Sequence, residues 1–98
     1  MCGIIGISST KPVIASIISS LKKLEYRGYD SAGIATLFEG KIKEIKSEGR
    51  VDTLEQNFDL KNLKGNIGIG HVRWATHGVP NSVNAHPHSS HNVSVVHN

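Results

Sequence analysis

A chain of 98 residues with 38% hydrophobic and 19% charged residues can form one small folded domain, and this balance excludes an intrinsically disordered chain. The net charge of +3 is mild, lysines alternate with glutamates, and few aromatic residues are available for base stacking, so no nucleic-acid partner is expected. No apolar run is long enough to cross a membrane, and the N-terminus lacks the pattern of a signal peptide. A single cysteine excludes an internal disulfide and fits a reducing compartment, so we expect a cytoplasmic protein with no membrane partner.

The first part of the chain predicts a strand followed by a helix. Residues 3–8 are β-branched and punctuated by glycine, which is typical of a buried strand. Residues 9–12 place two hydroxyl side chains before Lys-Pro, a pattern that indicates a capped helix start. Apolar side chains then recur at three- and four-residue spacing, on one face of a helix that should pack on the sheet: Val13, Ile14, Ile17, Ile18, Leu21 and Leu24.

The middle of the chain predicts a hairpin and a short helix. Residues 33–38 indicate a strand, and residues 39–40 predict a tight turn into a second strand over residues 41–46. The lysines of that second strand suit the edge of a sheet. Apolar spacing predicts a short helix over residues 51–58, and residues 59–65 form a connecting loop.

The last third of the chain predicts strands separated by an irregular loop. Residues 66–72 indicate a third glycine-spaced strand, residues 79–92 a loop rich in histidine and proline, and residues 93–98 a final strand. Only one long helix accompanies these strands, and the chain ends on a β pattern. We therefore expect residues 1–98 to be a fragment of a longer domain.

Cys2 is the only cysteine, and it lies directly after Met1. Removal of Met1 would leave one residue with both a thiol and a free α-amine. The thiolate is the nucleophilic form of cysteine, and an α-amine with a pKa of about 7.7–8.0 can accept a proton near neutral pH. A terminal nucleophile served by its own amine can cleave an amide. On position alone, an inert buried cysteine is the simpler interpretation.

Other polar groups leave alternatives open. Arg73 precedes a hydroxyl and an imidazole in residues 74–78, an arrangement that suits either a bound substrate carboxylate or a surface salt bridge. Asn98 ends a strand with an amide that suits either an oxyanion hole or a turn. Three histidines within residues 86–91 suggest a metal, but no cysteine or acidic neighbour completes a tetrahedral set, so no metal is expected.

Five strings of residues carry a family resemblance. The chain begins Met-Cys-Gly-Ile-Ile-Gly and contains Glu-Tyr-Arg-Gly-Tyr-Asp-Ser-Ala-Gly at residues 25–33 and His-Val-Arg-Trp-Ala-Thr-His-Gly at residues 71–78. With Asn-Ala-His-Pro-His at residues 84–88 and Val-His-Asn at residues 96–98, these strings resemble the class II glutamine amidotransferases. The resemblance implies an α+β fold, the N-terminal part of a four-layer α/β/β/α Ntn-hydrolase sandwich with mostly antiparallel sheets.

The same resemblance implies roles for the site residues. Cys2 would attack the side-chain amide of L-glutamine, with its own α-amine as the base. Asn98 would supply part of the oxyanion hole. Arg73 would bind the α-carboxylate of glutamine, and Thr76 and His77 would line the same pocket.

Four more residues would shape or gate the site. Trp74 would control the passage of ammonia, Arg27 and Gly28 would shape the surroundings of the nucleophile, and His86 would lie toward a domain interface. The resemblance implies no cofactor and no metal.

Within this family, the strings are most similar to the branch that transfers glutamine nitrogen to fructose 6-phosphate in amino-sugar biosynthesis. That resemblance implies a homodimeric full-length enzyme whose sugar-isomerising domains lie outside residues 1–98, and an isolated chain that is inactive. The nearest alternative is the branch that acts on phosphoribosyl pyrophosphate. A noncatalytic module that binds glutamine, or a metal through the histidines, is the alternative of a different class.

Overall fold

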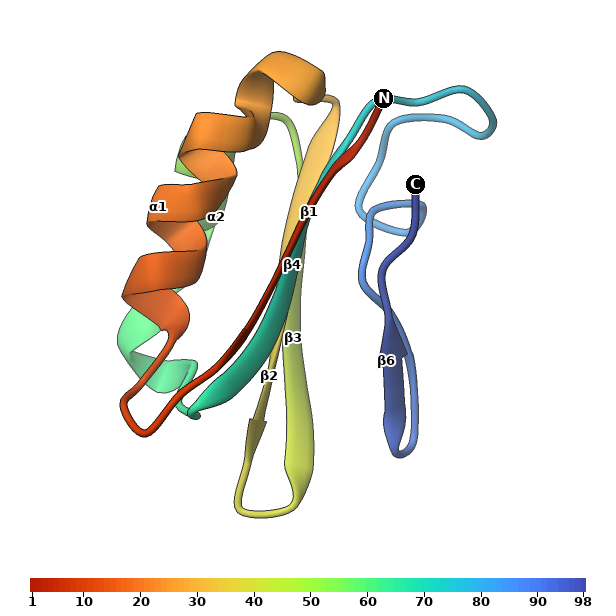
Figure 1. Cartoon of the computed structure of the whole chain (residues 1–98). Helices are drawn as coiled ribbons and strands as arrows, with labels where there is room; N and C mark the ends of the chain where they lie inside the picture. The colour runs from red at the N-terminus through yellow and green to blue at the C-terminus, as the bar shows by residue number, and fades with distance from the viewer.

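Four strands form an antiparallel sheet that carries two helices on one face and a two-stranded hairpin on the other (Figure 1). The computed structural model describes all of residues 1–98. The elements in chain order are β1 (Gly3–Ser8), α1 (Ile14–Leu24), η1 (Glu25–Arg27), β2 (Ser31–Phe38), β3 (Lys41–Glu48), α2 (Val51–Asn57), η2 (Leu60–Asn62), β4 (Ile67–Arg73), β5 (His88–Ser90) and β6 (Val93–Val95).

The strand order β1-β4-β2-β3 brings distant parts of the sequence to one end of the sheet. Gly3 at the start of β1 lies opposite Val72 near the end of β4, and Ser31 at the start of β2 lies opposite Arg73. The residues that flank these pairs, Cys2 and Trp74, therefore emerge at the same end. This register is what positions the site.

The hydrophobic core lies between the sheet and the two helices. Ile17 and Leu21 of α1, Ile34 of β2 and Leu54 of α2 are fully buried there. A Cβ atom at Gly70 of β4 would lie 2.8 Å from the side chain of Ile17, so glycine at this position lets α1 approach the sheet closely.

Most of the predicted elements are confirmed. The helical face of α1 is buried as expected, and residues 39–40 form the two-residue turn between β2 and β3, with φ of 50° at Glu39 and 76° at Gly40. A positive φ at both central residues is the geometry that favours tight hairpins. β3 lies at the edge of the sheet, as its lysines predicted.

Three local predictions are wrong. α1 has no side-chain cap, because the backbone before β4 takes that place: Val13 N–H donates to the Gly65 carbonyl at 3.0 Å, and Ser9 Oγ accepts from Lys11 N–H instead. β1 is an edge strand and only half buried, since Ile4 is 43% exposed. The expected irregular loop contains β5, which pairs with a final strand of only three residues.

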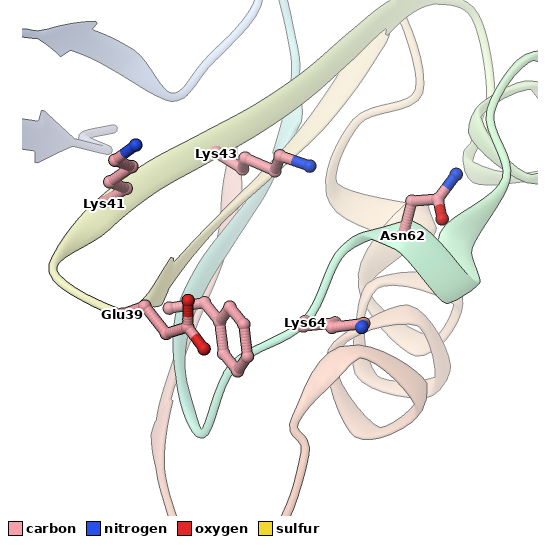
Figure 2. A pocket seen from close by; sticks show the side chains of 6 residues that line it. Glu39, Lys41, Lys43, Asn62 and Lys64 are labelled. Atoms are coloured by element: carbon pink, nitrogen blue, oxygen red, sulfur yellow. The ribbon is translucent and has the colours of Figure 1, made fainter.

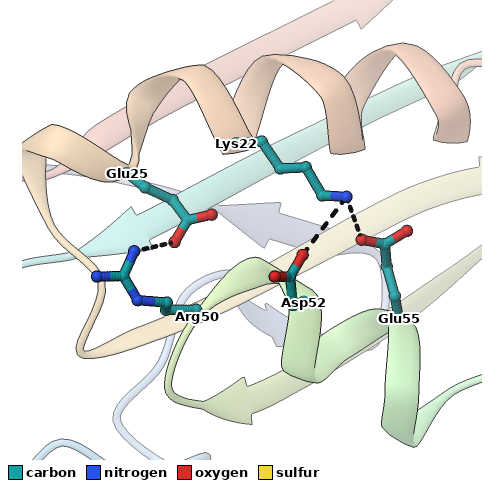
Figure 3. Close-up of polar contacts among 5 residues, drawn as sticks. All are labelled: Lys22, Glu25, Arg50, Asp52 and Glu55. Atoms are coloured by element: carbon teal, nitrogen blue, oxygen red, sulfur yellow. Dashed lines mark hydrogen bonds and ion pairs between the residues drawn. The ribbon is translucent and has the colours of Figure 1, made fainter.

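Ion pairs join the two helices on the outside of the molecule (Figure 3). Lys22 of α1 lies 2.5 Å from Glu55 and 3.4 Å from Asp52 of α2, and Glu25 lies 3.2 Å from Arg50. The two carboxylates raise the pKa of Lys22 above its ordinary value. Exposed pairs of this kind contribute little to stability, so the core holds the helices in place. Neither helix is long and apolar enough to cross a membrane.

Candidate active site

Cys2 lies directly before β1, at the end of the sheet where β4 ends, and its side chain is half buried. The N–H of Trp74 donates to the Cys2 sulfur at 3.4 Å, and the thiol lies 3.9 Å from the Trp74 carbonyl oxygen. Arg27 Nε donates to the Cys2 carbonyl at 3.0 Å. Cys2 is therefore held by Arg27 at the end of η1 and by Trp74 directly after β4.

Asn98 meets Cys2 across the whole length of the chain. The backbone nitrogen of Cys2 donates to Asn98 Oδ1 at 3.1 Å. Asn98 Nδ2 forms no hydrogen bond within the chain, and Asn98 and Cys2 line the same cavity. Figure 1 shows the two termini on the same side of the molecule.

A cavity of about 370 Å³ opens at this point, and its walls include Cys2, Asn98, Arg73, Trp74, Thr76 and His77. His86 also lines it. The structure thus brings together all the predicted site residues except Arg27 and Gly28, which support the wall from behind. Trp74 lies at the rim, where its side chain is 48% exposed.

Arg73 is nearly buried and shapes the loop that follows β4. Its guanidinium donates to the carbonyls of His77, Gly78 and Val79, the last at 3.2 Å. An arginine has five N–H donors, so one Nη1 hydrogen and the Nε hydrogen have no partner within the chain. Arg73 therefore both orders the loop and presents a positive charge to the site.

Gly28 fits a place where no side chain can be accommodated. A Cβ atom there would lie 2.6 Å from the carbonyl carbon of Arg73 and from the nitrogen of Trp74. The Arg27-Gly28 segment thus lies flat against the peptide that contacts the Cys2 sulfur.

Four histidines pack together at the cavity, and three of them, His86, His88 and His97, line it. The ring of His86 stacks on His71 at 4.2 Å between centroids, and it also contacts His88 at 4.3 Å and His97 at 4.4 Å. His71 is fully buried and its Nε2 lies 2.8 Å from the His97 carbonyl oxygen. Burial, together with the neighbouring imidazoles, lowers the pKa of His86 to about 4, and burial also lowers the pKa of His71 and His88.

The histidine cluster is not arranged as a metal centre. No group of three or more histidine, cysteine, aspartate or glutamate side chains is placed to hold a metal ion. The imidazoles instead stack face to face or edge to face, and the Nδ1 atoms of His71 and His86 have no hydrogen-bond partner. His71 and His97 were missed as site residues, because only the fold brings them beside His86.

A second cavity, of about 310 Å³, lies at the opposite end of the sheet (Figure 2). Its lining comes from the turn between β2 and β3 and from the segment after η2: Phe38, Glu39, Lys41, Lys43, Asn62 and Lys64. It contains no nucleophile and none of the predicted site residues. The cavity beside Cys2 is therefore the candidate active site.

No family model matches the chain. Its sequence is 54% identical over 98 residues to a glutamine–fructose-6-phosphate aminotransferase (isomerizing) of Bartonella henselae, and 55% identical over 100 residues to the protein of that name from Pyrococcus horikoshii. Both alignments cover the whole chain, which spans only 16% and 17% of the respective relatives.

Two solved structures share the fold. The glutamine phosphoribosylpyrophosphate amidotransferase of B. subtilis, complexed with ADP and GMP, has a TM-score of 0.79 and 30% identity over 96% of this chain, which corresponds to 20% of that protein. A structure described as the allosteric regulatory enzyme of purine biosynthesis has a TM-score of 0.78 and 31% identity over 89% of this chain, or 18% of that protein.

The chain therefore has the fold of an N-terminal-nucleophile glutamine amidotransferase domain. Its sequence is homologous, from Met1 to Asn98, to the N-terminal part of the glutamine–fructose-6-phosphate aminotransferases. The resemblance of the sequence motifs is thereby confirmed. Identity to the phosphoribosylpyrophosphate branch is lower, although the fold is shared.

Proposed function

We propose that residues 1–98 form the N-terminal portion of a class II glutamine amidotransferase domain, which hydrolyses L-glutamine to glutamate and ammonia. In a longer protein that also contains sugar-isomerising domains, this ammonia would aminate fructose 6-phosphate and give glucosamine 6-phosphate. The observation that supports this most is the meeting of the sulfur and nitrogen of Cys2 with Asn98 in a cavity that also holds Arg73.

The residues at the cavity suit an amide-cleaving reaction. After removal of Met1, the Cys2 nitrogen is an α-amine and can take the thiol proton. The thiolate attacks the side-chain carbonyl carbon of glutamine, and the free N–H donors of Asn98 stabilise the resulting oxyanion. The amine returns the proton to the departing ammonia, and water then hydrolyses the thioester to glutamate.

Arg73 and the loop after β4 suit the other end of the substrate. The two remaining N–H groups of Arg73 can bind the α-carboxylate of glutamine, and Thr76 and His77 line the cavity beside it. Trp74 at the rim is placed to control the exit of ammonia, and Arg27 and Gly28 hold the backbone around the nucleophile. We assign no cofactor and no metal to this reaction.

The family resemblance also supports a homodimeric full-length protein in the cytoplasm, with no nucleic-acid or membrane partner. His86 would face a neighbouring domain in that protein. With Met1 in place, the Cys2 nitrogen is an amide and cannot act as a base. We therefore expect the 98-residue chain that retains Met1 to be inactive.

The test is glutamine hydrolysis by the full-length protein, with the mass of its N-terminus determined in parallel. We expect Cys2 to be the first residue, ammonia to be released at an enzymatic rate, and a chloroketone analogue of glutamine to alkylate Cys2. Cys2→Ser is expected to abolish both the release of ammonia and the alkylation. Full activity in a protein that keeps Met1 would refute the proposed base.

A stoichiometric assay separates the two branches of the family. We expect the release of glutamate to be coupled to the amination of fructose 6-phosphate and not to that of phosphoribosyl pyrophosphate.

A further inference from the structure

The segment from Arg27 to Asp30 lies alongside the segment from Arg73 to Ala75. Gly28 contacts the peptide between Arg73 and Trp74, as described above. Two residues later, Asp30 N–H donates to the Arg73 carbonyl at 3.0 Å, and Asp30 Oδ2 accepts the N–H of Ala75 at 2.7 Å. The two bonds of Asp30 thus fall on either side of Trp74.

Asp30 is itself held in place by the sheet. Its carbonyl accepts the N–H of Gly49 at 2.8 Å, directly after β3, and its neighbour Ser31 begins β2 opposite Arg73. Its side chain is half buried. Asp30 is therefore fixed by the sheet, and it holds the end of β4 and the segment after it through its two hydrogen bonds.

The residue between these two bonds contacts the nucleophile. Trp74 N–H donates to the Cys2 sulfur at 3.4 Å, and it is the only backbone N–H that does so. That N–H lies in the peptide plane between Arg73 and Trp74, whose carbonyl oxygen accepts the N–H of Asp30. The Asp30 carboxylate holds the next plane, between Trp74 and Ala75, through the Ala75 N–H, and so limits rotation of the Trp74 backbone. A hydrogen bond to a charged group is stronger than one to a neutral group, so this donor favours the thiolate.

We propose that Asp30 is a positioning residue for the nucleophile: its N–H and its carboxylate together hold the two peptides of Trp74, so that the Trp74 N–H points at the Cys2 sulfur. The inference deepens the proposed function and rests on it for its catalytic meaning, but the hydrogen-bond relay itself does not require a substrate. An aspartate that serves only to stabilise the fold would leave the reactivity of the thiol in the folded protein unchanged.

The test measures the alkylation rate of Cys2 by iodoacetamide from pH 6 to pH 10 in the folded chain. We expect Asp30→Ala to lower this rate about tenfold at pH 7.5, and to move the pH profile toward higher pH, since the thiolate is the reactive form. Asp30→Asn keeps an oxygen that can accept from Ala75 N–H, and should restore the rate to within about twofold of the unsubstituted chain.

Glu48→Ala is the matched control. Glu48 is exposed at the same end of the sheet, and its carboxylate forms no hydrogen bond or ion pair with residues 73–75. It should leave the rate unchanged. Circular dichroism confirms that each variant is folded. Should Asp30→Ala fail to fold, Asp30→Ser decides, because its hydroxyl is too short to reach the Ala75 N–H and should also slow alkylation about tenfold.

Equal rates in the folded Asp30→Ala and unsubstituted chains would overturn the proposal, as would an Asp30→Asn variant as slow as Asp30→Ala. Absence of glutamine hydrolysis in the full-length protein, with the alkylation pattern as expected, would refute the proposed function and leave the positioning role intact. In an active full-length protein, Asp30→Ala should lower kcat for glutamine hydrolysis and leave KM within about twofold.

Discussion

The two faces of the central sheet differ in what they bury at the end that carries the site. The face toward α1 and α2 is apolar, and Ile17, Leu21 and Ile34 are fully buried there. The other face carries Arg73 and the histidine cluster at the cavity. Stability is therefore concentrated on one side of the sheet and chemistry on the other.

The face that carries the site also contains buried polar atoms that are not hydrogen-bonded. The buried Ser31 Oγ and the Nδ1 atoms of His71 and His86 have no hydrogen-bond partner, and a buried polar atom without a partner destabilises a fold. No such atom lies in the apolar core. The unpaired polar atoms are therefore confined to the face that carries the site.

Leu21→Ala should have the largest effect on stability. Leu21 is fully buried between α1 and the sheet, so its truncation should lower the free energy of unfolding by about 2–5 kcal/mol, as measured by urea denaturation. Leu37→Ala is the matched control: Leu37 lies on the opposite face and is 41% exposed, so it should cost about 1 kcal/mol or less. Equal losses would contradict the division between the faces.

Asn98→Ala should have little effect on stability and a large effect on catalysis. Asn98 is exposed, so its truncation should change the free energy of unfolding by no more than about 0.5 kcal/mol. In the full-length protein, loss of its amide donors should lower kcat for glutamine hydrolysis by about 10²–10³. Asn92→Ala, which alters an exposed asparagine in the turn between β5 and β6, should leave kcat unchanged. A similar kcat in both variants would remove Asn98 from the oxyanion hole.

The sequence predicted the apolar face better than the polar one, for physical reasons. The periodicity of α1 and the alternation of the strands are local, and they are sufficient to define a helix packed on a sheet. The start of α1 is not local, because Val13 N–H is paired with the Gly65 carbonyl, and no helix-cap pattern reveals such a partner.

The site was predicted from short strings, and its supports were not. Cys2, Arg73 and Asn98 stand out within their strings, and the structure places all three at one cavity. The contact between Asp30 and Ala75 spans 45 residues, and it depends on the pairing of β2 with β4. Asp30 was visible in its string, but only the fold shows what it contacts.

Acidification should weaken the polar face before the apolar one. Burial lowers the pKa of His86 to about 4, and it also lowers the pKa of His71 and His88, with Arg73 and Lys46 adding repulsion and Glu44 opposing it at His88. An unfolded histidine has a pKa of about 6.5. The unfolded chain therefore binds more protons between these values, and stability should fall as the pH drops from about 6.5 toward 4.

The measurement uses two signals from the same sample. Trp74 is the only tryptophan, so its fluorescence reports on the polar face, while circular dichroism at 222 nm reports on the helices. We expect the fluorescence to change at a higher pH than the helical signal, and the free energy of unfolding to fall by about 2 kcal/mol between pH 7 and pH 5. His86→Phe keeps an aromatic ring without a titrating group and should reduce this dependence. His91→Gln alters an exposed histidine outside the cluster and should preserve it. If both variants retained the full dependence, the acid sensitivity would come from groups other than the histidine cluster, and the polar face would be no weaker than the core.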